Sequence, residues 1–194
     1  MKWTADFETT TDPNDCRVWA YGVCKINEPE YFEYGNNIKD FLIFLRHHSR
    51  DDFYFHNLKF DGDFIIHYLL THGWKHQKDR KLLDGGQFYT LISDKGMFYM
   101  MEICFERNGN RKESVKIYDS LKIIPLSVDK VAKAFGLPIN KLKIDYHKFR
   151  EEGYMLDSEE IAYLNHDVKI MAMALNQVFR RGSHKNDSGV KCTS

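Results

Sequence analysis

Two carboxylates at alternate positions of the first hydrophobic segment place the strongest constraint on the fold. Residues 3–9 have the sequence Trp-Thr-Ala-Asp-Phe-Glu-Thr, which is typical of a β-strand. Side chains alternate along a strand, so Asp6 and Glu8 are expected on one face and Phe7 on the other, toward the core. Adjacent carboxylates raise each other's pKa unless a cation lies between them. This strand therefore ends either in solvent or at a cation site, and its oxygen ligands suit Mg²⁺ or Mn²⁺.

Apolar periodicity predicts strands and helices along the rest of the chain. Turn residues at 11–15 separate the first two strands, which are therefore expected to be antiparallel. Asn108-Gly109 is a strong hairpin signal between two later strands. Asp157 and Glu160 fit a capping box at the start of the last helix, and Arg180-Arg181-Gly182 is a typical helix end. We expect strands at residues 3–9, 16–26, 31–34, 52–55, 98–106 and 114–119, and helices at residues 38–47, 60–70, 126–135 and 157–179.

The composition is that of one globular domain. The chain has 194 residues, 43% of them hydrophobic and 29% charged, which excludes a disordered chain. No apolar run is long enough to cross a membrane and the N-terminus has no signal-peptide core, so we expect the protein in the cytoplasm, or in that of a host. The 28 basic and 28 acidic residues balance, which disfavours a protein that coats long duplexes. We expect one α/β domain at residues 1–182 and a polar, flexible tail at residues 183–194.

Asp61 and Asp167 lie in two further motifs, and neither motif on its own is strong evidence for a metal site. Asp61 falls on the first turn of a predicted helix, directly after a short buried strand, and sites gather at such strand ends. Taken alone, Asp61 or Asp63 more simply caps the helix N-terminus or stabilises it by its charge. Tyr163 and Asp167 are four residues apart and share one helix face. Taken alone, they are more simply a structural contact.

In chain order, these motifs resemble those of the DEDD-type 3′–5′ exonucleases. Asp6-x-Glu8 is followed by Asn57-x3-Asp61 and then by Tyr163-x3-Asp167. Longer stretches closely resemble the N-terminal proofreading domain of protein-primed family B DNA polymerases of the Bacillus phage type. The resemblance covers roughly residues 3–181 and implies an RNase H-like α/β fold, with a central mixed sheet flanked by helices. The stretches are residues 6–10, 16–22, 54–62, 117–122 and 144–148.

The resemblance implies a site that hydrolyses phosphodiesters with two Mg²⁺ or Mn²⁺ ions. Tyr163 matches the tyrosine that orients the attacking water in this family. Ala162 stands where a second subclass has a histidine, so the chain is assigned to the tyrosine subclass. A catalytic lysine of the family maps to Lys141, and Lys143 is close enough in sequence to take its role instead. The four acidic residues of the family's metal site match Asp6, Glu8, Asp61 and Asp167.

The resemblance also implies how a DNA 3′ end is held. Aromatic side chains can stack on unpaired bases without reading their sequence, which suits the trimming of a frayed end. Positions that match contacts to the single-stranded 3′ end are Thr9, Asn57, Phe60, Ser120, Leu121 and Tyr146, while His56 and Phe64 match positions linked to handling of the substrate or of a terminal protein.

The function implied by the resemblance is metal-dependent 3′–5′ hydrolysis of single-stranded or frayed DNA ends to nucleoside monophosphates, as in proofreading during DNA replication. The expected partners are a single-stranded DNA 3′ end and either a polymerase domain or a terminal protein. Two alternatives stay open: a non-catalytic module that binds terminal protein or single-stranded DNA, and a ribonuclease of the same fold. Asp119-Ser120-Leu121 is superficially like a polymerase motif, but the remaining polymerase signatures are absent, so we expect either a stand-alone nuclease or a fragment of a longer polymerase.

Overall fold

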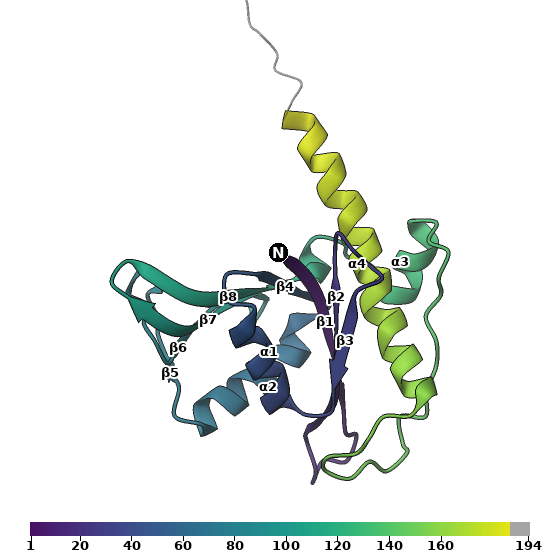
Figure 1. Cartoon of the computed structure of the whole chain (residues 1–194), viewed down its shortest axis with the longest axis horizontal. Coiled ribbons are helices and arrows are strands. Elements are labelled where there is room, and N and C mark those ends of the chain that lie inside the picture. Colours follow the sequence, from purple (N-terminus) through teal and green to yellow (C-terminus); the bar gives the residue numbers. More distant parts are fainter. Residues whose placement is uncertain (187–194) are drawn as a thin grey trace, which may run out of the picture.

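A mixed β-sheet of eight strands carries the architecture of the computed structural model. The backbone is described for residues 1–186 and the side chains for residues 1–182. The strand order is β3-β2-β1-β4-β8-β7-β6-β5, and helices pack on both faces of the sheet (Figure 1). The strands are β1 Lys2–Thr9, β2 Val18–Lys25, β3 Phe32–Gly35, β4 Asp52–Phe55, β5 Lys75–His76, β6 Gln87–Ile92, β7 Phe98–Asn108 and β8 Arg111–Asp119; the α-helices are α1 Ile38–His47, α2 Leu58–Thr71, α3 Val128–Ala134 and α4 Ser158–Asn186; and the 3₁₀ turns are Arg80–Leu82 and Ser120–Lys122.

Three parallel strands end at the same edge of the sheet. β4 pairs in parallel with β1 on one side and with β8 on the other, with Phe55 opposite both Ala5 and Asp119. β2 is antiparallel to β1, as the turn residues between them predicted. Asp6 and Glu8 lie just past the last β1 residue that pairs with β4. The acidic pair therefore lies at the carboxyl ends of the parallel strands, where binding sites form in open α/β sheets.

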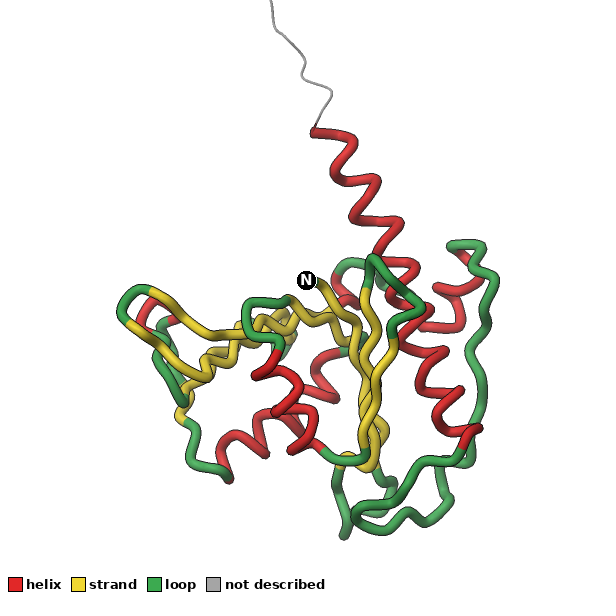
Figure 2. The backbone as a smooth tube through the Cα atoms, viewed as in Figure 1, coloured by secondary structure: helices red, strands yellow, loops and turns green. Residues whose placement is uncertain are grey.

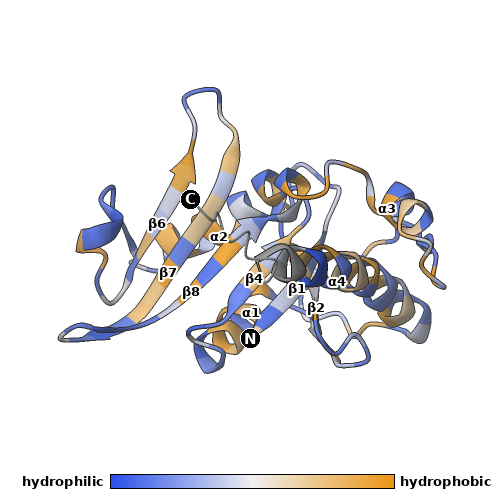
Figure 3. Cartoon of the chain, turned by 90° about the horizontal axis from the view of Figure 1, so that it is seen from above, coloured by the Kyte–Doolittle hydropathy of each residue, from blue (hydrophilic) through white to orange (hydrophobic). Residues whose placement is uncertain are grey.

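The alternation of side chains in β1 assigns its residues to two different cores. Phe7 belongs to the core beneath α1 and α2. Thr4 points the other way, and its hydroxyl donates a 2.8 Å hydrogen bond to the carbonyl oxygen of Val168 in α4. Because every second residue shares a face, Asp6 and Glu8 lie on the side of the sheet that α4 covers. Figure 2 shows the helices on the two sides of the strands, and Figure 3 shows that β7 and β8 each carry both hydrophobic and hydrophilic residues.

Every strand and helix predicted from the sequence is present, and two strands were missed. β5 and β6, at residues 75–76 and 87–92, extend the sheet beyond β7. The second strand begins at Val18 rather than at residue 16. The hairpin signal also shifts by one residue, because Asn108 pairs with Arg111 and the turn consists of Gly109 and Asn110. Gly109 has φ 61°, a left-handed conformation that glycine adopts without steric cost.

The end of the last helix was predicted too early. α4 continues through Gly182 to Asn186, so the polar tail predicted from residue 183 begins inside the helix. One exposed glycine costs a helix only about 1 kcal/mol relative to alanine, which does not stop a long helix. The rest of that predicted tail, residues 187–194, lies outside the described residues. No helix in the described part of the chain, α4 included, combines the length and apolar character needed to cross a membrane.

Two glycines offer a matched test of how α4 is held against the sheet. A Cβ at Gly22 in β2 would lie 2.7 Å from Cγ of buried Leu164, whereas a Cβ at Gly182 would meet nothing within 4 Å. We expect Gly22→Ala to lower the free energy of unfolding by about 1–3 kcal/mol, because α4 must move away from β2. We expect Gly182→Ala to raise it by about 0.5–1 kcal/mol through better helix propensity. Urea denaturation measures both; equal effects of the two changes would contradict the close packing at Gly22.

Candidate metal centre

Three carboxylates from the first strand and the last helix of the chain come together at the edge of the sheet. β1 supplies Asp6 and Glu8, and α4 supplies Asp167. One carboxylate oxygen from each lies within 4.8 Å of the others. Glu8 is 7% exposed and Asp167 only 3% exposed, so these are not solvated surface charges. The strand periodicity that placed Asp6 and Glu8 on one face thus leads to a buried acidic cluster.

Asp61 is buried beside this cluster, in the first turn of α2. Its simpler interpretation included a cap at the helix start, but that capping role falls to Asp119 at the end of β8. The Asp119 carboxylate accepts hydrogen bonds from the backbone N–H groups of Asn57 and Leu58, at 3.1 and 3.3 Å. Asn57 itself has φ 72°, a left-handed conformation that turns the chain sharply from β4 into α2. Asp61 is therefore not needed as a cap.

Unpartnered oxygens distinguish this cluster from an ordinary ion-pair network. Among the described side chains, three buried oxygen atoms have no hydrogen-bond partner, and they belong to Asp61, Asn165 and Asp167. Two of the three are carboxylate oxygens, one from Asp167 in the cluster and one from Asp61 beside it. A buried acceptor without a partner costs free energy, and a divalent cation would satisfy it. The donor set, all hard oxygen atoms, fits Mg²⁺ or Mn²⁺.

The carboxylates destabilise one another's charged forms. Burial, reinforced by the charge of Asp167, raises the pKa of Asp6 from 3.8 to about 7. Burial and the charges of Asp6 and Asp167 raise the pKa of Glu8 from 4.5 to about 9. Burial also raises the pKa of Asp61 and of Asp167. The cluster thus carries more negative charge than its surroundings balance.

Lys141 is the cation that the structure places at the cluster. Its ammonium group donates a hydrogen bond to Asp167 and lies 5.3 Å from the ring centroid of Tyr163. The neighbouring candidate, Lys143, is exposed. His166, next to Asp167 in sequence, points elsewhere and bonds to the carbonyl oxygen of Asn140 at 2.8 Å. One lysine against four carboxylates leaves a deficit of positive charge.

Tyr163 and Tyr146 meet beside the acidic cluster. Tyr163 is buried, and its hydroxyl lies 2.7 Å from that of Tyr146, which is 46% exposed. Burial and the charges of Glu8 and Asp167 raise the pKa of Tyr163, so its hydroxyl keeps its proton at neutral pH. A neutral phenol can both donate and accept a hydrogen bond, as the orientation of a water molecule requires.

The other residues expected to contact DNA differ in their accessibility. Phe60 is 52% exposed, and its ring packs against that of Phe64 with 5.6 Å between centroids. Ser120 is fully buried and donates to the carbonyl oxygen of Phe55 at 3.0 Å. His56 bonds to the Ser120 hydroxyl at 3.0 Å and to the carbonyl oxygen of Leu126 at 2.7 Å. Of the remaining three, Asn57 is exposed, and Thr9 and Leu121 are half-buried.

Sequence reasoning missed three residues around the cluster. It did not assign Asp119 as the cap of α2. It also did not pair the buried Arg150 with Glu160, although a guanidinium nitrogen of Arg150 lies 2.8 Å from a carboxylate oxygen of Glu160. The signal for Asp119 was its place at the end of a predicted strand. Glu160 was identified only as part of a capping box, and nothing in the sequence connected Arg150 with it.

Comparisons with known proteins agree with this architecture. The family model for DNA polymerase type B, organellar and viral, matches residues 44–156. The chain is 43% identical over 187 residues to the DNA polymerase of Bacillus phage phi29, covering 96% of this chain and 32% of that protein. It is 28% identical over 186 residues to the DNA polymerase of Streptococcus phage Cp-1, covering 89% and 29%. The chain thus spans about a third of the length of these relatives.

The similarity extends to solved structures. The phi29 DNA polymerase complexed with single-stranded DNA matches 93% of this chain and 32% of that one, with a TM-score of 0.87 and 42% sequence identity. The same polymerase complexed with primer-template DNA matches with a TM-score of 0.86. This agreement confirms the mixed α/β fold expected from the sequence.

The raised pKa values predict how stability depends on pH. The folded protein holds protons on Asp6 and Glu8 that the unfolded chain releases, so stability without metal should fall as pH rises from about 4 to about 9. Mn²⁺ should raise the thermal midpoint more near the upper end of this range than near the lower, because it binds the ionised carboxylates. Thermal unfolding in EDTA and in MnCl₂ across this range measures both effects.

Glu8→Gln is the diagnostic variant for this prediction, because it removes one charge from the cluster. It should raise the stability of the metal-free protein at high pH and reduce the Mn²⁺ effect. The control, Asp129→Asn, removes an exposed carboxylate that pairs with Lys133 at 2.7 Å, and should change neither. A Mn²⁺ effect as large in Glu8→Gln as in the wild type would show that the ion binds elsewhere.

Proposed function

The chain belongs to the organellar and viral DNA polymerases of type B, and on this premise we propose that it is a metal-dependent 3′–5′ exonuclease acting on single-stranded or frayed DNA ends. The observation that carries the proposal is the cluster of half-buried Asp6 with buried Glu8 and Asp167, and the buried Asp61 beside it. Such a cluster is costly without cations, and its donor set is the one that Mg²⁺ and Mn²⁺ prefer.

Two bound divalent ions would activate a water molecule and stabilise the oxygen that leaves phosphorus. Asp6, central on β1, would contact both ions. Glu8 and Asp167 would hold the first ion, and Asp61 would act at the second. These assignments follow the family resemblance; β1 supplies Asp6 and Glu8, α2 supplies Asp61 and α4 supplies Asp167.

Tyr163 and Lys141 complete the proposed machinery. The protonated hydroxyl of Tyr163 orients the attacking water, and its bond to Tyr146 limits the directions in which it can point. Lys141 compensates the charge of Asp167 and provides a fixed cation for the anionic phosphodiester. Both side chains act by position and charge, and neither has to change its protonation state.

The exposed aromatic rings support an unpaired substrate. Phe60, which precedes Asp61 in α2, and Tyr146, which bonds to Tyr163, are both about half exposed, so they can stack on bases that are not paired. The phi29 relative was solved with single-stranded DNA and with primer-template DNA, which favours DNA as the substrate here. The relatives are phage DNA polymerases, so we further propose proofreading in a host cytoplasm, beside a polymerase domain or a terminal protein.

The proposal predicts polarity and metal dependence. With Mg²⁺, a 5′-labelled single strand should shorten gradually to a ladder, and EDTA should abolish cleavage. Paired ends should be cut more slowly, because each step of melting costs about 1–2 kcal/mol of stacking. Denaturing gels with matched DNA and RNA substrates measure these properties.

Other results of these assays would either contradict the proposal or identify a different activity. Immediate release of the 5′ label as a mononucleotide would contradict the polarity, and cleavage in EDTA would contradict the metal mechanism. Faster cleavage of RNA would identify a ribonuclease. Tight binding of single-stranded DNA without any cleavage would identify a binding module.

Substitutions should separate the metal ligands from the tyrosine. Asp6→Ala removes the proposed bridging ligand, so activity should fall by several orders of magnitude. Tyr163→Phe removes one hydroxyl and leaves every carboxylate, so its loss should be smaller, about 10²–10⁴-fold. Single-turnover cleavage with a parallel DNA-binding assay measures both variants. Wild-type activity in Tyr163→Phe would make the tyrosine structural, and near wild-type activity in Asp6→Ala would misplace the metal site.

A further inference from the structure

The segment of residues 141–157 brings two side chains to the cluster without forming a helix or a strand. Lys141 and Tyr146 both belong to it, and each contacts α4. Segments of this length without secondary structure are uncommon in compact domains and have no regular hydrogen-bond ladder to hold them. Other contacts must therefore fix Tyr146 opposite Tyr163.

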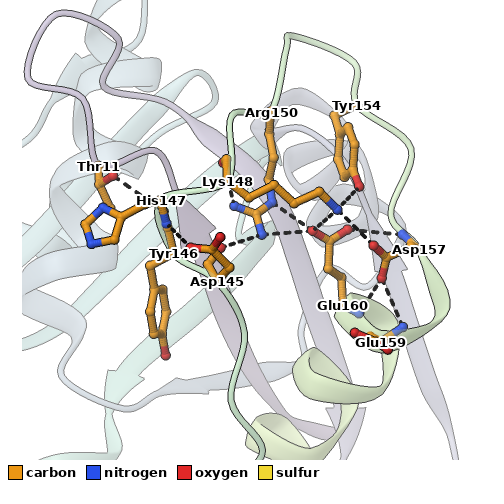
Figure 4. Close-up of polar contacts among 10 residues, drawn as sticks. All are labelled: Thr11, Asp145, Tyr146, His147, Lys148, Arg150, Tyr154, Asp157, Glu159 and Glu160. Atoms are coloured by element: carbon orange, nitrogen blue, oxygen red, sulfur yellow. Dashed lines mark hydrogen bonds and ion pairs between the residues drawn. The ribbon is translucent and has the colours of Figure 1, made fainter.

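Arg150 is the centre of those contacts. Its side chain is 2% exposed, and its guanidinium group lies 4.0 Å from the centroid of the Trp19 ring in β2. It donates to the carbonyl oxygens of Asp145 and Lys148 at 3.0 and 2.9 Å, so it bonds to the backbone immediately before Tyr146 and two residues after it. Figure 4 shows the guanidinium group between this part of the segment and α4.

Glu160 is the partner of Arg150 on α4. One of its oxygens accepts from the Arg150 guanidinium at 2.9 Å, and the other accepts from the backbone N–H of Asp157 at 3.1 Å. Asp157 in turn accepts from the Glu160 N–H at 2.9 Å, which completes a capping box at the start of α4. Glu160 is 4% exposed, so one buried carboxylate holds both the helix start and the arginine.

Glu160 is also in register with the reactive face of α4. Tyr163 follows it by three residues and Asp167 follows Tyr163 by four, spacings that place all three on one side of a helix. The same short stretch of α4 thus holds Arg150 and presents Tyr163. Any shift of Arg150 relative to Glu160 would move Tyr146 relative to Tyr163.

A second set of contacts ties the segment to the turn between β1 and β2. The Arg17 guanidinium donates to the carbonyl oxygens of Arg150 and Glu151, the latter at 3.2 Å. The hydroxyl of Thr11 donates to the carbonyl oxygen of Tyr146 at 3.4 Å. These bonds come from the β1–β2 turn and not from α4, so two separate parts of the fold hold the backbone around Tyr146.

We propose that Arg150 and Glu160 are positioning residues that hold Tyr146 against Tyr163 and thereby set the geometry of the attacking water. This role rests on the proposed exonuclease function. Neither side chain contacts the acidic cluster through any described bond, although the charge of Arg150 lowers the pKa of Glu8. Both residues position the site through the tyrosine pair. Arg150 needs its planar fork for this task, because it serves two backbone carbonyls, a carboxylate and an aromatic face together.

Arg150→Lys is the first test, because lysine keeps the charge beside Glu160 and loses the fork. We expect single-turnover cleavage to fall about 10²-fold, as for a small misplacement of a reacting group. The Mn²⁺ effect on thermal unfolding should stay at the wild-type value, because all four carboxylates remain. Wild-type cleavage by Arg150→Lys would overturn the proposal.

Combination with Tyr146→Phe separates positioning from general loss of structure. If Arg150 acts through the tyrosine pair, the double variant should be no slower than the slower single variant, within about twofold. Fully multiplicative losses would mean that Arg150 acts independently of Tyr146, and would overturn the proposal.

A control variant removes another ion pair of α4. Lys169→Met removes a lysine on α4 that pairs with Glu30 at 2.7 Å. It should cleave at the wild-type rate, and a 10²-fold loss would show that ion pairs in general matter here, against the specific role of Arg150.

Glu160→Gln carries the test if Arg150→Lys does not fold, because glutamine still completes a capping box. It should lower cleavage about tenfold or more with an unchanged Mn²⁺ effect; an unchanged rate would overturn the proposal. Hydrogen exchange of residues 145–157 gives a readout independent of activity. If wild type cleaves no DNA, the proposed function fails, while faster exchange in either variant than in wild type would still support the positioning role and unchanged exchange would overturn it.

Discussion

Mutual repulsion among buried carboxylates is the constraint on which the rest of this structure depends. Asp6, Glu8 and Asp167 approach within 4.8 Å, and burial with their own charges raises the pKa values of Asp6 and Glu8 to about 7 and 9. Groups in this situation move apart or take up protons unless the surrounding fold holds them. Much of the architecture around the cluster can be understood as the means of holding it.

The rigidity comes from close packing between α4 and the first strands. Gly22, opposite Asp6 in the sheet, leaves the space that Leu164 of α4 occupies. The hydrogen bond from Thr4 to the carbonyl oxygen of Val168 fixes the helix along its axis, one residue beyond Asp167. These contacts resist the repulsion without neutralising it, which leaves the cluster able to attract cations.

Local rules predicted the parts of the site that lie within one element. Alternation in β1 placed Asp6 and Glu8 together, and helical spacing placed Tyr163 and Asp167 on one face. The same rules missed β6, although Phe88 to Ile92 is an aromatic and β-branched run between glycine-rich turns. They also ended α4 at Gly182, because a glycine after two arginines is a common helix end but is tolerated where the helix continues.

The sequence by itself indicated an α/β fold and most of its elements, since these depend on periodicity, and the order of its motifs carried the resemblance that named the four acidic residues. Only the tertiary structure decided that Asp119 rather than Asp61 caps α2, that Lys141 rather than Lys143 meets Asp167, and that Arg150 is buried against Glu160. The physical reason is that each of these contacts joins residues from different elements. Their distances depend on how strands and helices pack, which no local pattern encodes.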